Sequence, residues 1–164
     1  MLSGEVRDRI TMEAAIDMAE SGHLVIGTLH TKSCAETIDR IINFYDPSDQ
    51  AQIKNLLSVL LKIVVSQRLL RSDKTNELVL VPEIMVVDQV VGACIRKEKF
   101  SVAEIEDAIQ GSSEKGSKGL ITALAELHVQ GKLSLAQIKN QVDEKNYDTL
   151  NRTIMQLNAR KVVS

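Results

Sequence analysis

Residues 24–29 read Leu24-Val25-Ile26-Gly27-Thr28-Leu29, a short and mostly apolar run that does not alternate between apolar and polar positions. Such a run is typical of a strand buried on both faces, as in a parallel sheet covered by helices. A helical pattern from Thr11 to Ser21 comes before it, and Gly22 follows that pattern as a natural end of a helix. The run therefore predicts an α/β fold with a mostly parallel sheet and flanking helices.

The segments that follow continue the α/β pattern. Apolar stripes predict one helix over residues 35–42 and a second from Ile53 to Val64. Leu69-Leu70 and Leu78 to Val81 are predicted as two strands, joined by the polar turn of residues 72–76.

From Asp88 onward the sequence predicts only helices. Ser101 and Ser134 each begin a capping box, in which Glu104 or Gln137 stands three residues later at a helix start. We therefore predict two parts: residues 1–87, which form the α/β part, and residues 88–164, which form an all-helical C-terminal region.

The composition excludes several classes of function. Of 164 residues, 44% are apolar and 26% charged, and the net charge is −2, which gives no broad attraction to nucleic acid or anionic lipid. The apolar stretch from Leu56 to Val65 is interrupted by Ser58 and Lys62 and is too short for a membrane span. Cys34 and Cys94 are isolated from each other, which fits a reducing cytoplasm.

A charged cluster, Gly4-Glu5-Val6-Arg7-Asp8, follows residues that could end a strand. A carboxylate at the C-terminal edge of a parallel strand lies where doubly wound sheets bind ligands. There it could hold a water on Mg²⁺ or orient an attacking water in phosphoryl transfer. The alternative from these five residues alone is a solvated group of charges.

His23 and His30 stand at the two ends of the apolar run. They cannot ligate one zinc ion, because a strand of seven residues spans roughly 23 Å. His30 would lie at the carboxyl end of its strand, at the same edge as Glu5 if the strands are parallel, where an imidazole could contact a γ-phosphate. The alternative is a partly exposed histidine without a function.

The glycine-rich segment from Gly111 to Gly119 superficially resembles a phosphate-binding loop. In such a loop the second glycine is followed by Lys and then by Ser or Thr, but here Ser117 comes before Lys118. The residues before the segment, Val102 to Ile109, are predicted as a helix instead of the required strand. We interpret the segment as a linker, and the sequence contains no other candidate for a phosphate-binding loop.

The motifs taken together resemble the secretion and type IV pilus ATPase superfamily of P-loop NTPases. Gly4 to Asp8 is similar to its Walker B segment, and Gly22 to Thr31 is similar to its histidine box. The resemblance continues, in order and with matching spacing, to about residue 140. Within the superfamily the chain looks most like the pilus retraction motors of twitching motility, because it lacks the four-cysteine zinc insertion common in extension and type II secretion motors.

This resemblance implies a partial RecA-like ATPase core that uses ATP and Mg²⁺. Glu5 would be the Walker B glutamate near Mg²⁺, and His23 and His30 the histidine-box residues, with His30 sensing the γ-phosphate. Arg7 and Asp8 would connect the site to neighbouring elements. No metal site made of protein ligands alone is expected.

The resemblance also implies a cytoplasmic homo-hexamer at the inner membrane that acts on a pilus platform protein. Such motors insert no segment into the membrane, and nucleic acid is not an expected partner. The Walker A loop and other catalytic segments of the family precede the Walker B segment and are absent from these 164 residues. The isolated chain is therefore expected to bind no nucleotide and to be inactive.

Three interpretations remain open at this point. One is an unrelated helical interaction module with chance motif matches, which the order and spacing of the motifs disfavour. The other two accept the resemblance. In these two, the chain is either a C-terminal fragment of a retraction ATPase or a short, non-catalytic relative that regulates or supports a pilus or secretion motor. The helix after Pro82 keeps only Ile95-Arg96 of a pattern frequent in retraction motors. Residues 146–164 extend past the motifs that carry the resemblance, which assigns them no role.

Overall fold

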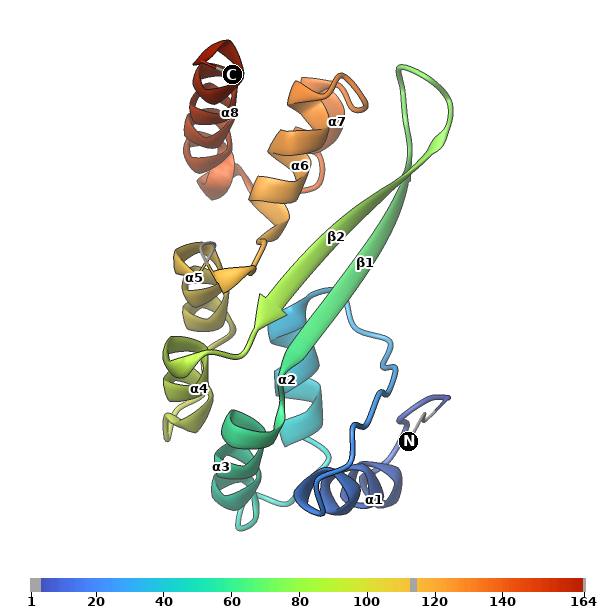
Figure 1. Ribbon diagram of the computed structural model, residues 1–164, viewed down its shortest axis with the longest axis vertical. Coiled ribbons are helices and arrows are strands. Elements are labelled where there is room, and N and C mark those ends of the chain that lie inside the picture. The colour runs from blue at the N-terminus through green and yellow to red at the C-terminus, as the bar shows by residue number, and fades with distance from the viewer. Residues whose placement is uncertain (1–3, 113–114, 164) are drawn as a thin grey trace. The chain divides into compact units, whose positions relative to one another are not determined.

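The apolar stripes near the start of the chain form helices (Figure 1). The Asp8 side chain caps the first helix by accepting the Thr11 N–H at 2.8 Å, and Ser33 caps the second by accepting the Glu36 N–H at 3.2 Å. The helices are α1 (Arg9–Glu20), α2 (Cys34–Ile42) and α3 (Gln50–Leu60). The helix predictions are confirmed here, although Val64 belongs to the strand that follows.

An antiparallel hairpin follows α3. Its strands are β1 (Ile63–Arg71) and β2 (Leu78–Val86). The Ser72 N–H donates to the Glu77 carbonyl oxygen at 2.8 Å, and at the other end the Val87 N–H donates to the Lys62 carbonyl oxygen at 3.0 Å. Both bonds fit the same pairing of residues between the strands, so one register holds from the turn to the open end of the hairpin. The predicted strands and turn are confirmed, and the strands are longer than predicted.

The structure is a computed structural model that describes residues 4–112 and 115–163. It divides into two units: residues 1–66 with 84–117, and residues 67–83 with 118–164. The predicted boundary between residues 87 and 88 lies where the sequence pattern changes from mixed strands and helices to helices only, and it stays a prediction about domain organisation.

In its described residues, the first unit packs five α-helices around one apolar core. The two helices after the hairpin are α4 (Gln89–Arg96) and α5 (Val102–Gly111). Helix α4 packs on α3, and α5 packs on α2. Gly92 permits the close approach of α4, since a Cβ there would lie 3.2 Å from the Ser58 carbonyl oxygen. The core includes the fully buried side chains of Cys34, Ile38, Met85, Val91, Ile95 and Ile105.

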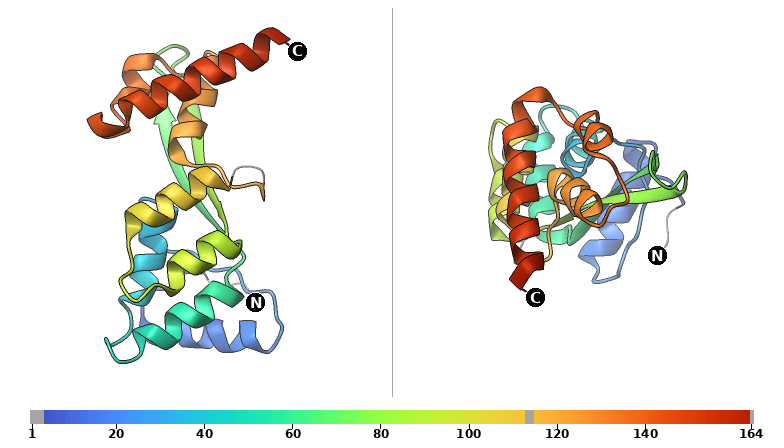
Figure 2. Two further views of the ribbon diagram at one scale, coloured as in Figure 1. Left: turned by 90° about the vertical axis from the view of Figure 1, so that its left-hand side faces the viewer. Right: turned by 90° about the horizontal axis from the view of Figure 1, so that it is seen from above.

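The second unit combines the hairpin tip with the C-terminal helices. These are α6 (Leu120–Val129), α7 (Leu135–Lys139), the 3₁₀ helix η2 (Glu144–Asn146) and α8 (Tyr147–Val163). Helices α6 and α8 lie side by side (Figure 2). Their shared core is formed by Val81, Leu124, Leu133, Ile138 and Leu150.

Two predictions about the sheet require correction. Among the described residues the sheet is the two-stranded antiparallel hairpin, and not a mostly parallel sheet. Residues 24–29 contain a single bridge residue, Ile26, and the side chains of Leu24 and Ile26 are 76% and 54% exposed. The predicted burial of this run on both faces is wrong. An apolar composition indicates that a segment tends to be buried, but it does not identify which other segments would pack against it.

Within the described ranges, no helix is both long and apolar enough to cross a membrane.

Candidate functional site

The candidate site begins where two separate segments of the first unit come together. The Val6 N–H donates to the Thr28 carbonyl oxygen at 2.9 Å, and the Thr28 hydroxyl donates to the Gly4 carbonyl oxygen. Val6 is buried, with 3% of its surface exposed, and belongs to the core of the first unit. The core therefore anchors the segment that carries Glu5 beside the segment that carries His30.

Glu5, Arg7 and His30 form a charged cluster at this junction. Oε1 of Glu5 lies 3.1 Å from Nε2 of His30, and the Arg7 guanidinium forms an ion pair with Oε2 of Glu5. The hydrogen bond from Arg7, with the His30 ring nearby, holds the pKa of Glu5 below its ordinary value. The Glu5 side chain is 25% exposed and the His30 side chain 81%, so the imidazole has an open face for a ligand.

Asp8 and His23 lie at the two ends of α1 and not in this cluster. The Asp8 carboxylate caps the helix, and the hydrogen bond from the Thr11 N–H lowers its pKa. Nδ1 of His23 lies 2.9 Å from the Ser21 hydroxyl, in the turn after α1. Of the five predicted site residues, the structure thus brings together Glu5, Arg7 and His30.

The cluster suits Mg²⁺ only as part of a larger site. No group of three or more His, Cys, Asp or Glu side chains within residues 4–112 and 115–163 is placed to hold a metal ion. Mg²⁺ in nucleotide sites usually keeps several waters and is bound through one or two carboxylates and the substrate phosphates. The partly exposed Glu5 carboxylate fits that limited role, in which Mg²⁺ would balance phosphate charge.

The glycine-rich segment does not take part in this site. Helix α5 precedes it, and Ser117 accepts the Val86 N–H at 3.0 Å through its hydroxyl. Residues 113–114 of the segment lie outside the described residues. The helix in front of the segment supports its interpretation as a linker.

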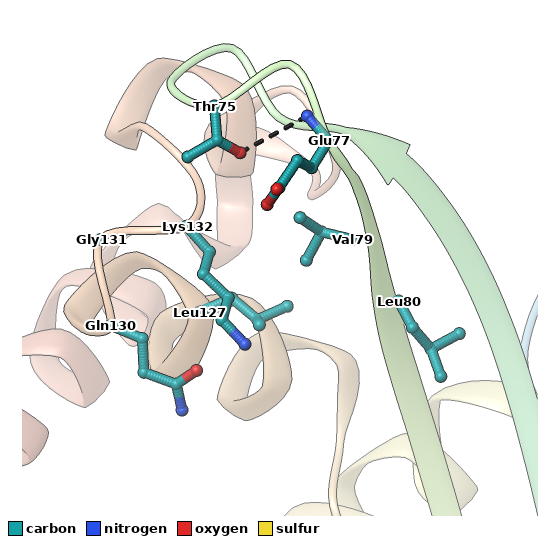
Figure 3. Close-up of a pocket in the computed structure, with 8 residues that line it drawn as sticks. All are labelled: Thr75, Glu77, Val79, Leu80, Leu127, Gln130, Gly131 and Lys132. Atoms are coloured by element: carbon teal, nitrogen blue, oxygen red, sulfur yellow. Dashed lines mark hydrogen bonds between the residues drawn. The ribbon is translucent and has the colours of Figure 1, made fainter.

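A pocket of about 350 Å³ in the second unit contains none of the predicted site residues (Figure 3). Its walls come from the end of the hairpin and from α6 with the turn after it. The lining residues are Thr75, Glu77, Val79, Leu80, Leu127, Gln130, Gly131 and Lys132.

The sequence did not indicate how the two segments of the site are joined. Thr28 binds the residues on both sides of Glu5, and this role was not predicted. The available signal was a hydroxyl side chain in an otherwise apolar run, two residues before His30.

Comparison with known proteins assigns the family. The family described as "Type II/IV secretion system protein" matches residues 1–163. The chain therefore belongs to this family.

The similar curated proteins include pilus motors. The chain is 37% identical over 134 residues to the type IV pilus retraction ATPase PilT of Pseudomonas aeruginosa, which covers 82% of this chain and 38% of that protein. It is 35% identical over 131 residues to a twitching motility protein of Neisseria gonorrhoeae, which covers 80% of this chain and 34% of that protein. The chain thus spans less than two fifths of the length of these relatives.

Solved structures give the same result for the fold. The crystal structure of the pilus retraction motor PilT with bound ADP superimposes with a TM-score of 0.75 at 32% identity, covering 88% of this chain and 40% of that chain. The ATPase DotB of Legionella pneumophila has a TM-score of 0.69 at 23% identity over 84% of this chain and 37% of that one, which shows likeness of fold alone.

Proposed function

We propose that this chain contributes the Walker B and histidine-box side of an ATP site in a motor that drives type IV pilus retraction. The observation that carries the proposal is the 3.1 Å approach of the Glu5 carboxylate to the His30 imidazole. These residues are separated by 25 positions in the sequence, yet they meet at one exposed point beside a buried anchor. The resemblance to PilT, a motor whose crystal structure contains ADP, supports a nucleotide as the ligand.

In this proposal each site residue has a separate role. Glu5 orients a water or a Mg²⁺-bound water, and Arg7 keeps the Glu5 carboxylate charged and in place. His30 responds to the γ-phosphate through its exposed ring. Asp8 and His23 act indirectly, because they fix the two ends of α1, which connects the two site segments.

The wider proposal follows the family. The first part of the chain belongs to a RecA-like core and the later part to a helical C-terminal region. The complete motor is a cytoplasmic homo-hexamer at the inner membrane and acts on a pilus platform protein, without a nucleic acid partner. The net charge of −2 agrees with that last point.

The phosphate-binding half of the site has to come from other residues. The 164 residues contain no GxxxxGK motif followed by Ser or Thr, and that motif supplies the N–H cradle and the lysine for the phosphates. We therefore expect the chain alone to hydrolyse ATP no faster than a buffer control, as measured by phosphate release.

A chimera tests the positive half of the proposal. The part of P. aeruginosa PilT upstream of its match is joined to residues 4–163 of this chain, and ATP hydrolysis is measured. We expect Glu5→Gln to lower kcat by about 10²-fold or more, because a positioned charge is lost from the transition state. Glu144→Gln, an exposed glutamate of η2, is the matched control and should leave kcat unchanged. An active chimera that is insensitive to Glu5→Gln would overturn the proposal.

A further inference from the structure

Thr28 contacts the backbone on both sides of Glu5. Its carbonyl oxygen accepts the Val6 N–H at 2.9 Å, and its hydroxyl donates to the Gly4 carbonyl oxygen. We infer that Thr28 is a positioning residue, which holds the Glu5 carboxylate at the His30 ring through its side-chain hydroxyl. This inference rests on the proposed function for the role of the Glu5–His30 pair in an ATP site. The positions of the two side chains do not depend on that function.

The hydroxyl takes over a task that the backbone performs in a regular sheet. In a parallel pair of strands, a residue makes two backbone bonds to the opposite strand. Its carbonyl oxygen accepts from one N–H there, and its own N–H donates to the carbonyl oxygen of the residue two positions before that N–H. Thr28 makes the first of these bonds with Val6 through its backbone, and it reaches the Gly4 carbonyl oxygen with its side chain. In the backbone arrangement seen here, a residue without a hydroxyl at position 28 would hold only one side of Glu5.

The close approach of the two segments is specified by the neighbouring residue as well. A Cβ at Gly27 would lie 3.1 Å from Cγ2 of Val6, tighter than an ordinary contact. Because Val6 is buried in the core, it has little freedom to move aside. The contact at Thr28 is therefore built into the packing of the first unit and is not a chance encounter of two exposed chains.

The position of Thr28 connects it directly to the imidazole. His30 follows two residues later, and in extended backbone such residues project to the same side. In the sequence, Glu5 lies between the two residues that Thr28 binds, through the Gly4 carbonyl oxygen on one side and the Val6 N–H on the other. Without the hydroxyl bond the segment at Gly4 is free to rotate, and the carboxylate keeps Arg7 as a partner while its distance to His30 increases.

The test uses the 164-residue chain without nucleotide. In Thr28→Val, which keeps the branched shape and removes the hydroxyl, we expect the nuclear Overhauser contact between the Glu5 side chain and the His30 ring to be lost. A titration of the Glu5 carboxyl carbon by NMR should show its pKa moving upward, since His30 is one of the groups that lower it. Thr28→Ser should restore both signals, because it returns the hydroxyl.

Two further variants complete the design. Thr149→Val changes an exposed threonine of α8 and should leave both readouts at their wild-type values. Gly27→Ala should act in the same direction as Thr28→Val by separating the segments. Thr28→Val with an intact Glu5–His30 contact, or Thr28→Ser behaving like Thr28→Val, would overturn the inference. Because no ATP is used, this result is independent of the chimera experiment.

Discussion

At the scale of single residues, Asp88 is a carboxylate with little exposure to solvent and three hydrogen-bond donors around it. It lies between β2 and α4 with 8% of its side chain exposed. It accepts hydrogen bonds from the Val91 N–H at 2.9 Å, the Lys115 ammonium at 3.0 Å and the Ser112 hydroxyl at 3.1 Å. The bond from the Val91 N–H is the main cause that lowers the pKa of Asp88 from 3.8 to about 2.

This shift makes the stability of the protein depend on pH in a defined direction. The pKa is lower in the folded chain than in the unfolded chain, so the folded state favours the charged carboxylate. The stabilisation is fully present above pH 4 and is lost as the pH falls toward 2.

We predict that Asp88→Asn lowers the free energy of unfolding at pH 7 by about 1–2 kcal/mol. Asn can still cap α4, but the charge-assisted bond to Lys115 is lost. The variant should also lose less stability than the wild type between pH 4 and pH 2. Urea unfolding followed by circular dichroism at several pH values measures both effects.

Asp143→Asn is the control for this prediction. Asp143 is 78% exposed and its ion pair with Lys145 spans 3.9 Å, so its removal should change stability by less than about 0.5 kcal/mol. Equal effects of the two substitutions would show that burial of Asp88 has no energetic consequence.

At the scale of elements, features set by nearby residues could be predicted from the sequence, and features set by distant residues could not. Helix α2 could be predicted because the apolar stripe over residues 35–42 is a local signal within one helix. The run from Leu24 to Leu29 could not, because burial depends on neighbours that the pattern does not identify. In the candidate site, the residue types of Glu5 and His30 were recognisable, but the link through Thr28 depends on side-chain geometry.

A capping box that was predicted from sequence shows the same limit. Ser134 caps α7 by accepting the Gln137 N–H at 3.1 Å, as the motif predicts. The Gln137 side chain, however, does not return to Ser134. It donates to the Arg71 carbonyl oxygen at 2.6 Å and accepts the Asp73 N–H at 3.2 Å, while the Asp73 carboxylate accepts the Ser134 N–H. Asp73 of the hairpin turn thus accepts the Ser134 N–H in place of Gln137. The same set of hydrogen bonds holds the turn against α7.

We predict that Gln137→Leu loosens this turn without unfolding the second unit. The substitution removes two hydrogen bonds near the surface and should cost about 1 kcal/mol. Because Asp73 N–H loses its acceptor, its hydrogen exchange should accelerate by roughly fivefold to tenfold, as followed by NMR.

Gln156→Leu provides the comparison, since Gln156 is exposed on α8. Exchange at Asp73 should stay at the wild-type rate in that variant. A Gln137→Leu protein whose turn exchanges as slowly as the wild type would show that the bonds between the turn and α7 contribute nothing to its order.

At the scale of the whole molecule, each unit has its own buried core, and the hairpin carries aliphatic side chains that remain uncovered. In the second unit Leu69, Leu78 and Leu80 are 60%, 58% and 47% exposed. The hairpin register places Leu69 opposite Leu80, so two of these side chains adjoin on one face. Neighbouring exposed aliphatic side chains on a two-stranded sheet favour association with other chains.

We therefore predict that the 18.1 kDa chain associates with itself as its concentration rises, and that the double substitution Leu69→Lys with Leu80→Lys prevents this. Two opposed lysines repel copies of the same face and keep it hydrated. Sedimentation equilibrium over a series of concentrations should give a rising average mass for the wild type and a constant monomer mass for the double variant.

Met155→Lys, at a single side chain of α8 that is 70% exposed, should behave like the wild type, because one isolated apolar residue is ordinary on a protein surface. A wild-type chain that remains monomeric throughout the series, or a Met155→Lys variant that is as monomeric as the double variant, would rule out the hairpin face as the cause of association.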